Sequence, residues 1–368
     1  MHTSASSIPA TMAAVQLTGH GGYDKLEFNV DVPTPAPGPG EVLIQVGAAG
    51  VNNTDINTRI GWYSKTVSEA TASADIDVAD DADGSWNGSP IVFPRIQGAD
   101  CCGRIVAVGA DVDPGRVGER VLVRSMQAIE PSGDHPSLAL VTMGSEYNGA
   151  FAQFLVTGSC HALAVESTWT DIELASLPCA YSTAEGMLHR ASVAAERVLI
   201  TGASGGVGSA AIQLAKRRGA SVTAIAGRSK LDAVCALGAD EVIAREDGLL
   251  DQVATNCIDV VLDLVAGPVF ADLLETLRPG GRYVTSGAIA GPIVDLDVRT
   301  LYLKDLTLFG STFQPDEIFE NLVSYVEAGE IRPLVAGTYP LAEIAAAQEE
   351  FLAKRYVGKL VLIPPAVS

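Results

Sequence analysis

Two patterns of apolar and polar positions divide the chain. From Met12 to about Ser167, short apolar runs such as EVLIQVGAAGV and GERVLVRS are separated by turn signals, including PTPAPGPG. This pattern is typical of β-strands joined by turns. From about Thr168 to Phe313, short apolar runs alternate with helical patterns. That alternation predicts a parallel sheet with helices on both faces.

The second region is expected to contain six strands. They are predicted at Val198–Thr201, Ser221–Ala226, Glu241–Ala244, Val260–Val265, Arg282–Ser286 and Leu306–Gly310. A helix near Asp316–Ala328 and a final strand, VGKLVLI, follow. We expect these last elements to return to the first region, so that residues 1–167 and 314–368 form one discontinuous domain and residues 168–313 another. Two domains fit a chain of 368 residues, because one hydrophobic core rarely serves that length.

One polar segment interrupts the β region. Thr66 to Pro90, TVSEATASADIDVADDADGSWNGSP, is acidic and rich in Gly and Ser, which predicts a long surface loop or lid. It closely follows Tyr63. It therefore either caps a substrate cleft and limits substrate size, or forms a disordered acidic loop on the surface.

Composition and charge restrict the partners. The net charge of −20 opposes binding to the phosphates of a nucleic acid. No apolar run reaches the ~18 residues that span a membrane, and the start, MHTSASSIPA, lacks the features of a signal peptide. The six Cys are scattered without a CxxC pair, which is typical of reduced thiols. We expect a cytoplasmic protein that binds neither nucleic acid nor membrane.

A glycine-rich segment follows the predicted strand Val198–Thr201 and precedes a helix. In a strand–turn–helix unit, such glycines let the backbone approach a pyrophosphate, and the helix N-terminus attracts its charge. The context within a βαβ unit favours a dinucleotide site over a tight structural turn. We assign the cofactor phosphates to Ala203, Ser204, Gly205, Gly206, Val207 and Gly208.

The end of the next predicted strand indicates which dinucleotide binds. An NAD site has Asp or Glu about 20 residues past the glycines, where the ribose hydroxyls lie. This chain has Arg228, Ser229 and Lys230 there, and Arg245 follows the next strand. Cations and a hydroxyl attract a 2′-phosphate, which a carboxylate would repel. The sequence therefore predicts NADP(H), with solvated surface cations as the alternative interpretation.

The chain resembles the medium-chain dehydrogenase/reductase superfamily over nearly its whole length. Four motifs carry the resemblance: AAGVNNTDINTRIGWY (Ala48–Tyr63), FPRIQGADCCGRIVAVG (Phe93–Gly109), LPCAYSTAEGML (Leu177–Leu188) and GASGGVG (Gly202–Gly208). The resemblance implies an α/β fold, with a GroES-like β domain, a Rossmann domain built on a doubly wound parallel sheet, and an active site between them.

Zinc-dependent members of that superfamily take catalytic zinc from a Cys, a His and a Cys in the first three motifs. This chain has Asn52, Ala99 and Cys179 at those positions. Catalytic zinc needs three protein ligands with N, S or O donors, so we expect no metal. Cys179 is then interpreted as a pocket-wall or core residue.

The first motif is similar to the zinc-free quinone oxidoreductase-like branch. The resemblance implies that Asn52 and Tyr63 line the nicotinamide and substrate cleft as catalytic residues, and that Thr183 lies against the nicotinamide. From the fold, Ser286, Gly287 and Phe313 are expected beside the cofactor. Structural roles stay open: a turn for Asn52, a domain-edge aromatic for Tyr63 and a helix start for Thr183.

The sequence thus predicts an NADPH-dependent, zinc-independent oxidoreductase that transfers hydride to a quinone or an α,β-unsaturated carbonyl. Conjugated acceptors are favoured because, without zinc, nothing strong polarises an isolated ketone. The alternatives are an NADP-dependent alcohol or carbonyl dehydrogenase without zinc, alcohol dehydrogenase-like in fold, and a redox-silent NADPH-binding protein. The run DLTLFGSTF reads as an edge strand, and edges need covering, so a homodimer is expected.

Overall fold

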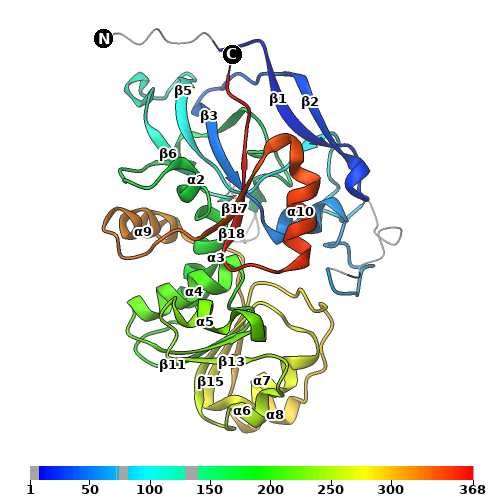
Figure 1. Ribbon diagram of the computed structural model, residues 1–368, viewed down its shortest axis with the longest axis vertical. Coiled ribbons are helices and arrows are strands. Elements are labelled where there is room, and N and C mark those ends of the chain that lie inside the picture. The colour runs from blue at the N-terminus through cyan, green and yellow to red at the C-terminus, as the bar shows by residue number, and fades with distance from the viewer. Residues whose placement is uncertain (1–7, 72, 74–81, 129–139, 368) are drawn as a thin grey trace.

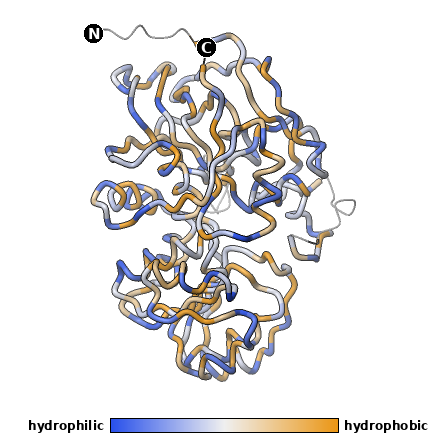
Figure 2. Tube along the Cα trace, viewed as in Figure 1, coloured by the Kyte–Doolittle hydropathy of each residue, from blue (hydrophilic) through white to orange (hydrophobic). Residues whose placement is uncertain are grey.

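The structure, a computed structural model, describes residues 8–71, 73, 82–128 and 140–367. The chain forms two lobes, and both chain ends lie at the outer end of the β-rich lobe (Figure 1). Hydrophobic and hydrophilic segments alternate along the chain in both lobes (Figure 2). The middle of the acidic 66–90 segment lies outside the described residues.

The β-rich lobe contains a seven-stranded sheet, a three-stranded sheet of order β2-β1-β4 and a two-stranded pair, β7-β8. The large sheet has the order β10-β6-β5-β3-β18-β17, with β9 also paired to β3. The strands are β1 (Thr11–Leu17), β2 (Leu26–Pro33), β3 (Glu41–Gly50), β4 (Arg95–Ile96), β5 (Cys102–Val108), β6 (Arg120–Val123), β7 (Met126–Ala128), β8 (Leu140–Thr142), β9 (Phe154–Gly158), β10 (Ala162–Ala164), β17 (Val335–Pro340) and β18 (Lys359–Ile363). Because β18 pairs with β3, the end of the chain completes a sheet that its beginning started.

The other lobe is built on one six-stranded sheet of order β13-β12-β11-β14-β15-β16, and every pairing in it is parallel. Its strands are β11 (Arg197–Ile200), β12 (Ser221–Ala226), β13 (Glu241–Ala244), β14 (Ile258–Asp263), β15 (Leu277–Thr285) and β16 (Thr307–Gly310). The order reverses between β11 and β14, and such a switch point is where open α/β sheets bind ligands. The predicted α/β fold class, with a β-rich lobe and a doubly wound parallel sheet in the other lobe, is thereby confirmed.

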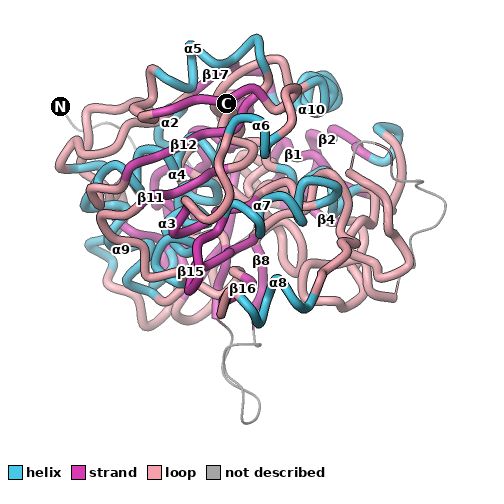
Figure 3. The backbone as a smooth tube through the Cα atoms, turned by 90° about the horizontal axis from the view of Figure 1, so that it is seen from below, coloured by secondary structure: helices cyan, strands magenta, loops and turns pink. Residues whose placement is uncertain are grey.

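The helices are α1 (Asn53–Arg59), α2 (Asp171–Leu174), α3 (Pro178–Arg190), α4 (Gly206–Arg217), α5 (Leu231–Cys235), α6 (Leu249–Gln252), α7 (Phe270–Thr276), α8 (Val298–Leu303), α9 (Asp316–Glu327) and α10 (Ile344–Ala353). Helices cover both faces of the parallel sheet (Figure 3). Alternation along β11 shows this, because Val198 and Ile200 pack with α3 and α4 whereas Leu199 packs with α6 and α7. Side chains of a strand point alternately to the two faces of a sheet, so a strand buried on both faces is apolar throughout.

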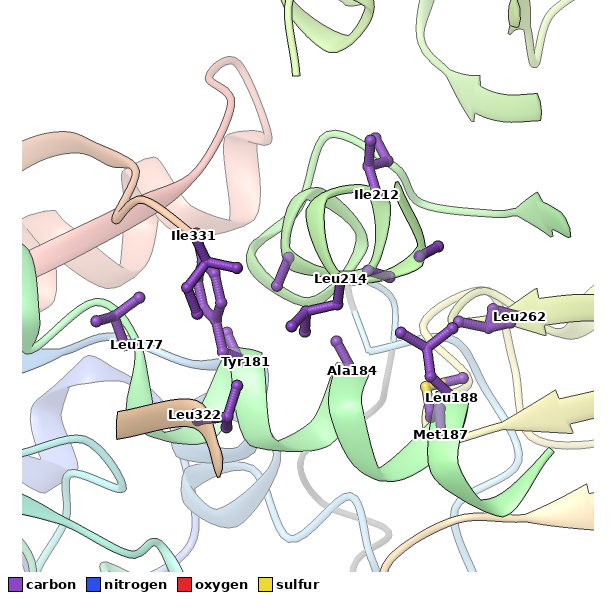
Figure 4. Close-up of a cluster of buried hydrophobic side chains, with 14 of the residues drawn as sticks. Leu177, Tyr181, Ala184, Met187, Leu188, Ile212, Leu214, Leu262, Leu322 and Ile331 are labelled. Carbon is purple, nitrogen blue, oxygen red and sulfur yellow. The ribbon is translucent and has the colours of Figure 1, made fainter. Parts of the chain in front are cut away.

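Helix α3 connects the two lobes. Its residues Tyr181, Met187 and Leu188 are fully buried in the cluster that also holds Leu214 of α4 and Leu262 of β14 (Figure 4). The same cluster takes in Leu322 and its neighbours on α9. A continuous core therefore runs between the lobes, and the boundaries expected at 167/168 and 313/314 stay a prediction.

Two expected strands differ in their bounds from the observed ones. β15 already begins at Leu277, which pairs with Ile258, and the register shifts before Arg282 pairs with Val260, where Gly280 stands at φ 72. β14 ends at Asp263 rather than Val265, because the Asp263 carboxylate accepts hydrogen bonds from the Val265 and Ala266 N–H groups and turns the chain there.

Candidate active site

The glycine-rich segment forms a phosphate-sized opening between β11 and α4. Gly205 precedes the first helical residue, Gly206, and is solvent-exposed. A Cβ on Gly208 would lie 2.7 Å from Ala203 Cα, so only glycine lets α4 pack this close to β11. Helix α4 has 12 residues and begins at Gly206, and the N–H groups of its first turn lack partners within the helix. This is the geometry that binds a pyrophosphate.

A cavity of about 510 Å³ extends from this opening along the ends of β12 and β13. Its volume is in the range of small-molecule and cofactor sites. Of the residues assigned to the cofactor from sequence, Ser204, Gly205, Gly206, Lys230 and Arg245 line it. The C-terminal segment closes one side with Phe351, Lys354, Tyr356 and Gly358, which the sequence analysis did not connect to the cofactor.

The other assigned residues do not line this cavity. Ala203 is fully buried, Val207 is half-buried, and Gly208 faces β11. Ser286 and Gly287 follow β15, where the Gly287 carbonyl accepts from Thr285 Oγ1 at 3.1 Å. The Phe313 carbonyl accepts from Arg190 at 3.2 Å. Their roles toward a cofactor stay predictions.

Three cations meet at the far end of the cavity: Lys230, Arg245 and Lys354. Lys230 Nζ donates to the Lys354 carbonyl at 2.9 Å. Loss of hydration and then the charge of Arg245 lower the pKa of Lys230. Loss of hydration and the charges of Lys230 and Lys359 lower the pKa of Lys354, whose ammonium nitrogen lies 3.5 Å from the centre of the Phe351 ring. Arg245 is 69% exposed and pairs with Glu246 at 3.3 Å, so among the described residues only Lys230 and Lys354 of the three lack a salt bridge. Two such neighbouring cations favour an anion between them.

Arg228 lies differently from the other cations. Its guanidinium pairs with Asp247, and its backbone N–H donates to Glu246 at 3.1 Å. Its side chain is 60% exposed and does not line the cavity, and Ser229 beside it is exposed. A role for Arg228 and Ser229 at a phosphate therefore stays a prediction, and it requires Arg228 to leave Asp247.

Between the lobes lies a buried cluster that the sequence analysis largely missed. Lys359 Nζ is 2.8 Å from Asp100 Oδ2, and it also donates to Asn52 Oδ1. Asn52 Nδ2 donates to the same Asp100 oxygen at 2.8 Å, and the Cys179 backbone N–H donates to Asp100 Oδ1 at 2.6 Å. The side chains of Lys359 and Asp100 are 4% and 0% exposed. The available signal was a lysine at the start of an otherwise apolar strand, VGKLVLI.

Asn52 is the N-cap residue of helix α1. Its backbone N–H donates to Asp55 Oδ2 at 2.7 Å in a capping box, so the turn that orients Asn52 is held by Asp55. Thr183 Oγ1 donates to the Cys179 carbonyl at 2.7 Å within α3. Burial, followed by the charge of Asp100, raises the pKa of the Cys179 thiol to about 12. The thiol is therefore protonated at neutral pH.

Tyr63 stands at the edge of this cluster. Its hydroxyl donates to Thr54 Oγ1 at 3.1 Å, and burial raises its pKa. Its ring lies 5.3 Å from that of Trp86, which belongs to the acidic 66–90 segment. The backbone N–H of Trp86 donates to Ser145 Oγ at 3.2 Å, so this part of the segment is docked on the β lobe next to Tyr63. For these residues, the geometry favours a cap over a free loop.

Replacing Asp55 with asparagine is expected to flatten the dependence of stability on pH. Burial, opposed by the Asn52 N–H and the Lys359 charge and assisted by Asp100, raises the pKa of Asp55 to about 7. The folded state then holds a proton that the unfolded chain releases near pH 4, so stability falls as pH rises from about 4 to about 7. Urea unfolding at pH 5 and pH 8 should show wild type losing about 2–4 kcal/mol more than Asp55→Asn. Equal losses in the two proteins would contradict the assignment.

Family models match both lobes. The model described as "Alcohol dehydrogenase GroES-like domain" matches residues 38–167, and that described as "Zinc-binding dehydrogenase" matches residues 206–328. A solved structure from Sinorhizobium meliloti 1021, assigned as an alcohol dehydrogenase, shares 47% identity with a TM-score of 0.86, covering 97% of this chain and 98% of that one. The chain belongs to the medium-chain dehydrogenase/reductase family. The predicted resemblance is thus confirmed.

Two curated relatives that match nearly the whole chain are named as oxidoreductases. Quinone oxidoreductase of Rattus norvegicus is 27% identical, covering 96% of this chain and 98% of the relative. Acryloyl-coenzyme A reductase of Metallosphaera sedula is 29% identical, covering 95% and 99%. Erythronolide synthase EryA2 of Saccharopolyspora erythraea is 31% identical over 99% of this chain, which spans only 9% of that protein. The protein is therefore an oxidoreductase of a family whose members use nicotinamide cofactors.

Proposed function

We propose that the protein is an NADPH-dependent, zinc-independent reductase that transfers hydride to a quinone or an α,β-unsaturated carbonyl. The observation that carries the proposal is the buried cluster of Asn52, Asp100 and Lys359, which stands where zinc-dependent relatives bind their metal.

The residues present fit a dinucleotide. The start of α4 supplies N–H groups that a pyrophosphate needs, next to the exposed Gly205, and the cavity extends from this turn toward β12 and β13. Lys230, Arg245 and Lys354 line its far end. Three converging cations match a 2′-phosphate, which NADP(H) carries and NAD(H) lacks.

The residues present do not fit catalytic zinc. Asn52 is an amide bonded to Lys359 and Asp100, and Ala99 has no donor, so Cys179 is the one thiol left at the three ligand positions. An ammonium group beside them repels a divalent cation. In the described part of the chain, no group of three or more His, Cys, Asp or Glu side chains could hold a metal ion. One matching family model is described as a zinc-binding dehydrogenase, but this chain lacks the ligand set that catalytic zinc needs.

The proposed reaction follows from what the cleft offers. A bound reduced nicotinamide supplies the hydride. Addition to the β-carbon of an enone, or to a quinone, moves an electron pair onto the distant oxygen, and solvent then supplies the proton. The cleft's task is to orient the acceptor and to stabilise that oxygen's charge with fixed donors. Tyr63, Asn52 and Thr183 are the side chains proposed from sequence to line it.

Two relatives support conjugated acceptors. The names quinone oxidoreductase and acryloyl-coenzyme A reductase belong to proteins that match nearly the whole chain. A second candidate is an NADP-dependent alcohol dehydrogenase without zinc, which the 47% identical alcohol dehydrogenase from S. meliloti favours. Under that reading, the isolated carbonyl would be polarised by side chains alone.

We expect NADPH oxidation with an enone or quinone at a kcat/KM at least about 100-fold above that with a simple aldehyde. Without a strong polarising group, the activation barrier for hydride transfer to an isolated carbonyl rises by several kcal/mol. A conjugated acceptor depends less on such a group, because conjugation spreads the developing charge. Absorbance at 340 nm with matched acceptors measures the ratio. EDTA and 1,10-phenanthroline should leave the enone rate unchanged. Faster aldehyde turnover, or activity that needs added zinc, would favour the second candidate.

Two further features stay proposals. All six cysteines are unpaired, which supports a reducing compartment such as the cytoplasm. No helix in the described part of the chain is long and apolar enough to cross a membrane. Strand β16 is an edge of the parallel sheet, and we propose that a second copy covers it in a homodimer.

A further inference from the structure

The ion pair of Lys359 and Asp100 is costly to bury. The two side chains are 4% and 0% exposed. Removing both charges from water costs several kcal/mol per ion, and hydrophobic replacements of such pairs are often neutral or stabilising. A buried pair next to the cofactor-sized cavity, which Gly358 lines, and supported by further hydrogen bonds, is therefore a candidate for function rather than for stability.

Five elements meet at Lys359. The residue begins β18, Asp100 precedes β5, Asn52 caps α1, and Cys179 lies in the first turn of α3. The stem of Lys359 runs past the start of α4, because a Cβ on Gly206 would lie 2.7 Å from Lys359 Cδ. The ammonium group thus stands between the phosphate-binding turn and the positions of the missing metal ligands.

Other donors in the cleft are already engaged. The Asn52 amide donates to Asp100 at 2.8 Å and to the Gly50 carbonyl at 3.4 Å, and the Tyr63 hydroxyl donates to Thr54. An ammonium group has three N–H donors. Among the described residues, the acceptors found at Lys359 Nζ are one oxygen of Asp100 and one of Asn52. This leaves one N–H of Lys359 for a ligand.

We propose that Lys359 is a further catalytic residue, whose remaining N–H donates to the carbonyl oxygen of the bound acceptor and stabilises the charge that hydride addition places there. A side-chain cation then acts at the position where zinc-dependent relatives hold a metal. Asp100 and Asn52 are positioning residues that fix the ammonium group. The inference rests on the proposed function and extends it to a named donor.

A different role would also use a cation here. Because Lys359 passes α4, its ammonium group could instead contact the cofactor pyrophosphate. The two roles predict different effects of a variant. Loss of a donor to the acceptor lowers kcat, whereas loss of a phosphate ligand raises the Kd for NADPH.

The test compares wild type, Lys359→Arg and the double variant Lys359→Met/Asp100→Asn. The double variant removes both charges, because Lys359→Met alone would leave a buried carboxylate unpaired. With the acceptor that wild type reduces fastest, kcat of the double variant should fall about 10²–10³-fold, the usual loss for one oxyanion donor. The Kd for NADPH, measured by cofactor fluorescence without acceptor, should stay within about threefold. Lys359→Arg, which keeps a cationic donor, should recover part of kcat.

The proposal is overturned if the double variant keeps kcat within about tenfold of wild type, or if its Kd for NADPH rises tenfold with kcat retained. If the double variant does not fold, Lys359→Arg decides. A kcat at least about tenfold lower, with unchanged NADPH affinity, supports the proposal, and an unchanged kcat refutes it. Failure of wild type to reduce any enone or quinone would instead refute the proposed function, so the two failures are distinguishable.

Discussion

Replacing Lys230 and Lys354 together with glutamine should raise the Kd for NADPH at least about 100-fold and leave that for NADH within about threefold. A hydrogen bond to a charged group contributes about 1.5–3 kcal/mol, and each 1.4 kcal/mol is about tenfold in affinity. Both side chains line the cavity end where the 2′-phosphate is proposed to bind, and both are partly removed from water there. Among the described residues, neither forms a salt bridge with a carboxylate. Only NADPH carries the group that these cations would contact.

Fluorescence titration with both cofactors, at one fixed salt concentration, measures the two constants. Arg355→Gln is the matched control, because Arg355 is adjacent to Lys354 but 73% exposed and paired with Glu350. It should change neither constant beyond the general effect of one surface charge. An equal loss for NADH and NADPH in the double variant would show that the cations support the fold of the pocket rather than a phosphate.

Arg228→Gln separates the sequence-based assignment from the structural one. From the sequence, Arg228 was assigned to the 2′-phosphate because Arg228 closely follows β12, and residues at the end of this strand contact the ribose of the cofactor. The structure instead pairs it with Asp247 and points Lys230 into the cavity. If Arg228 swings to the phosphate when NADPH binds, Arg228→Gln will weaken NADPH about as much as Lys230→Gln. If it stays with Asp247, the variant will bind NADPH like wild type.

The local pattern was sufficient for the parallel sheet. β12 and β13 were predicted at Ser221–Ala226 and Glu241–Ala244, where the structure has them. Such strands are buried on both faces, so their apolar runs are unambiguous and short glycine-containing connections mark their ends. The phosphate-binding turn was equally predictable, because its glycines and its strand–helix context lie within a dozen consecutive residues.

The buried cluster between the lobes could not be predicted in the same way. Asn52, Asp100 and Lys359 are separated by 48 and 307 positions along the chain. Their contact depends on β18 returning to pair with β3, a long-range pairing that local periodicity does not encode. Lys354 was missed for the same reason, since it reaches the cavity only because α10 brings it back to the Rossmann lobe. Sequence thus located the glycine-rich turn that is proposed to bind the cofactor's phosphates, while the contact between Asp100 and Lys359 became apparent only from tertiary structure.

Replacing Gly208 with alanine should destabilise the protein even without cofactor. The new Cβ would stand 2.7 Å from Ala203 Cα, and that atom belongs to backbone fixed by the hydrogen bond from the Ala203 N–H to the Ile225 carbonyl at 3.1 Å. Neither α4 nor the strand can yield without disturbing the core, where Ala203 and Leu214 are buried together. Overpacking typically costs about 1–3 kcal/mol, so in a chain of 368 residues the melting temperature of the apo protein should fall by about 1–4 °C.

Gly205→Ala is the informative comparison, because it changes the same turn by the same methyl group. Its Cβ would meet only the Gly202 carbonyl, at 3.4 Å, and Gly205 is exposed. The melting temperature of the apo protein should therefore stay within about 1 °C of wild type. The methyl group would nevertheless stand where a pyrophosphate approaches the backbone, so the Kd for NADPH should rise at least about tenfold. If Gly205→Ala binds NADPH normally, the pyrophosphate does not lie at this turn, and the cofactor orientation proposed for the cavity is wrong.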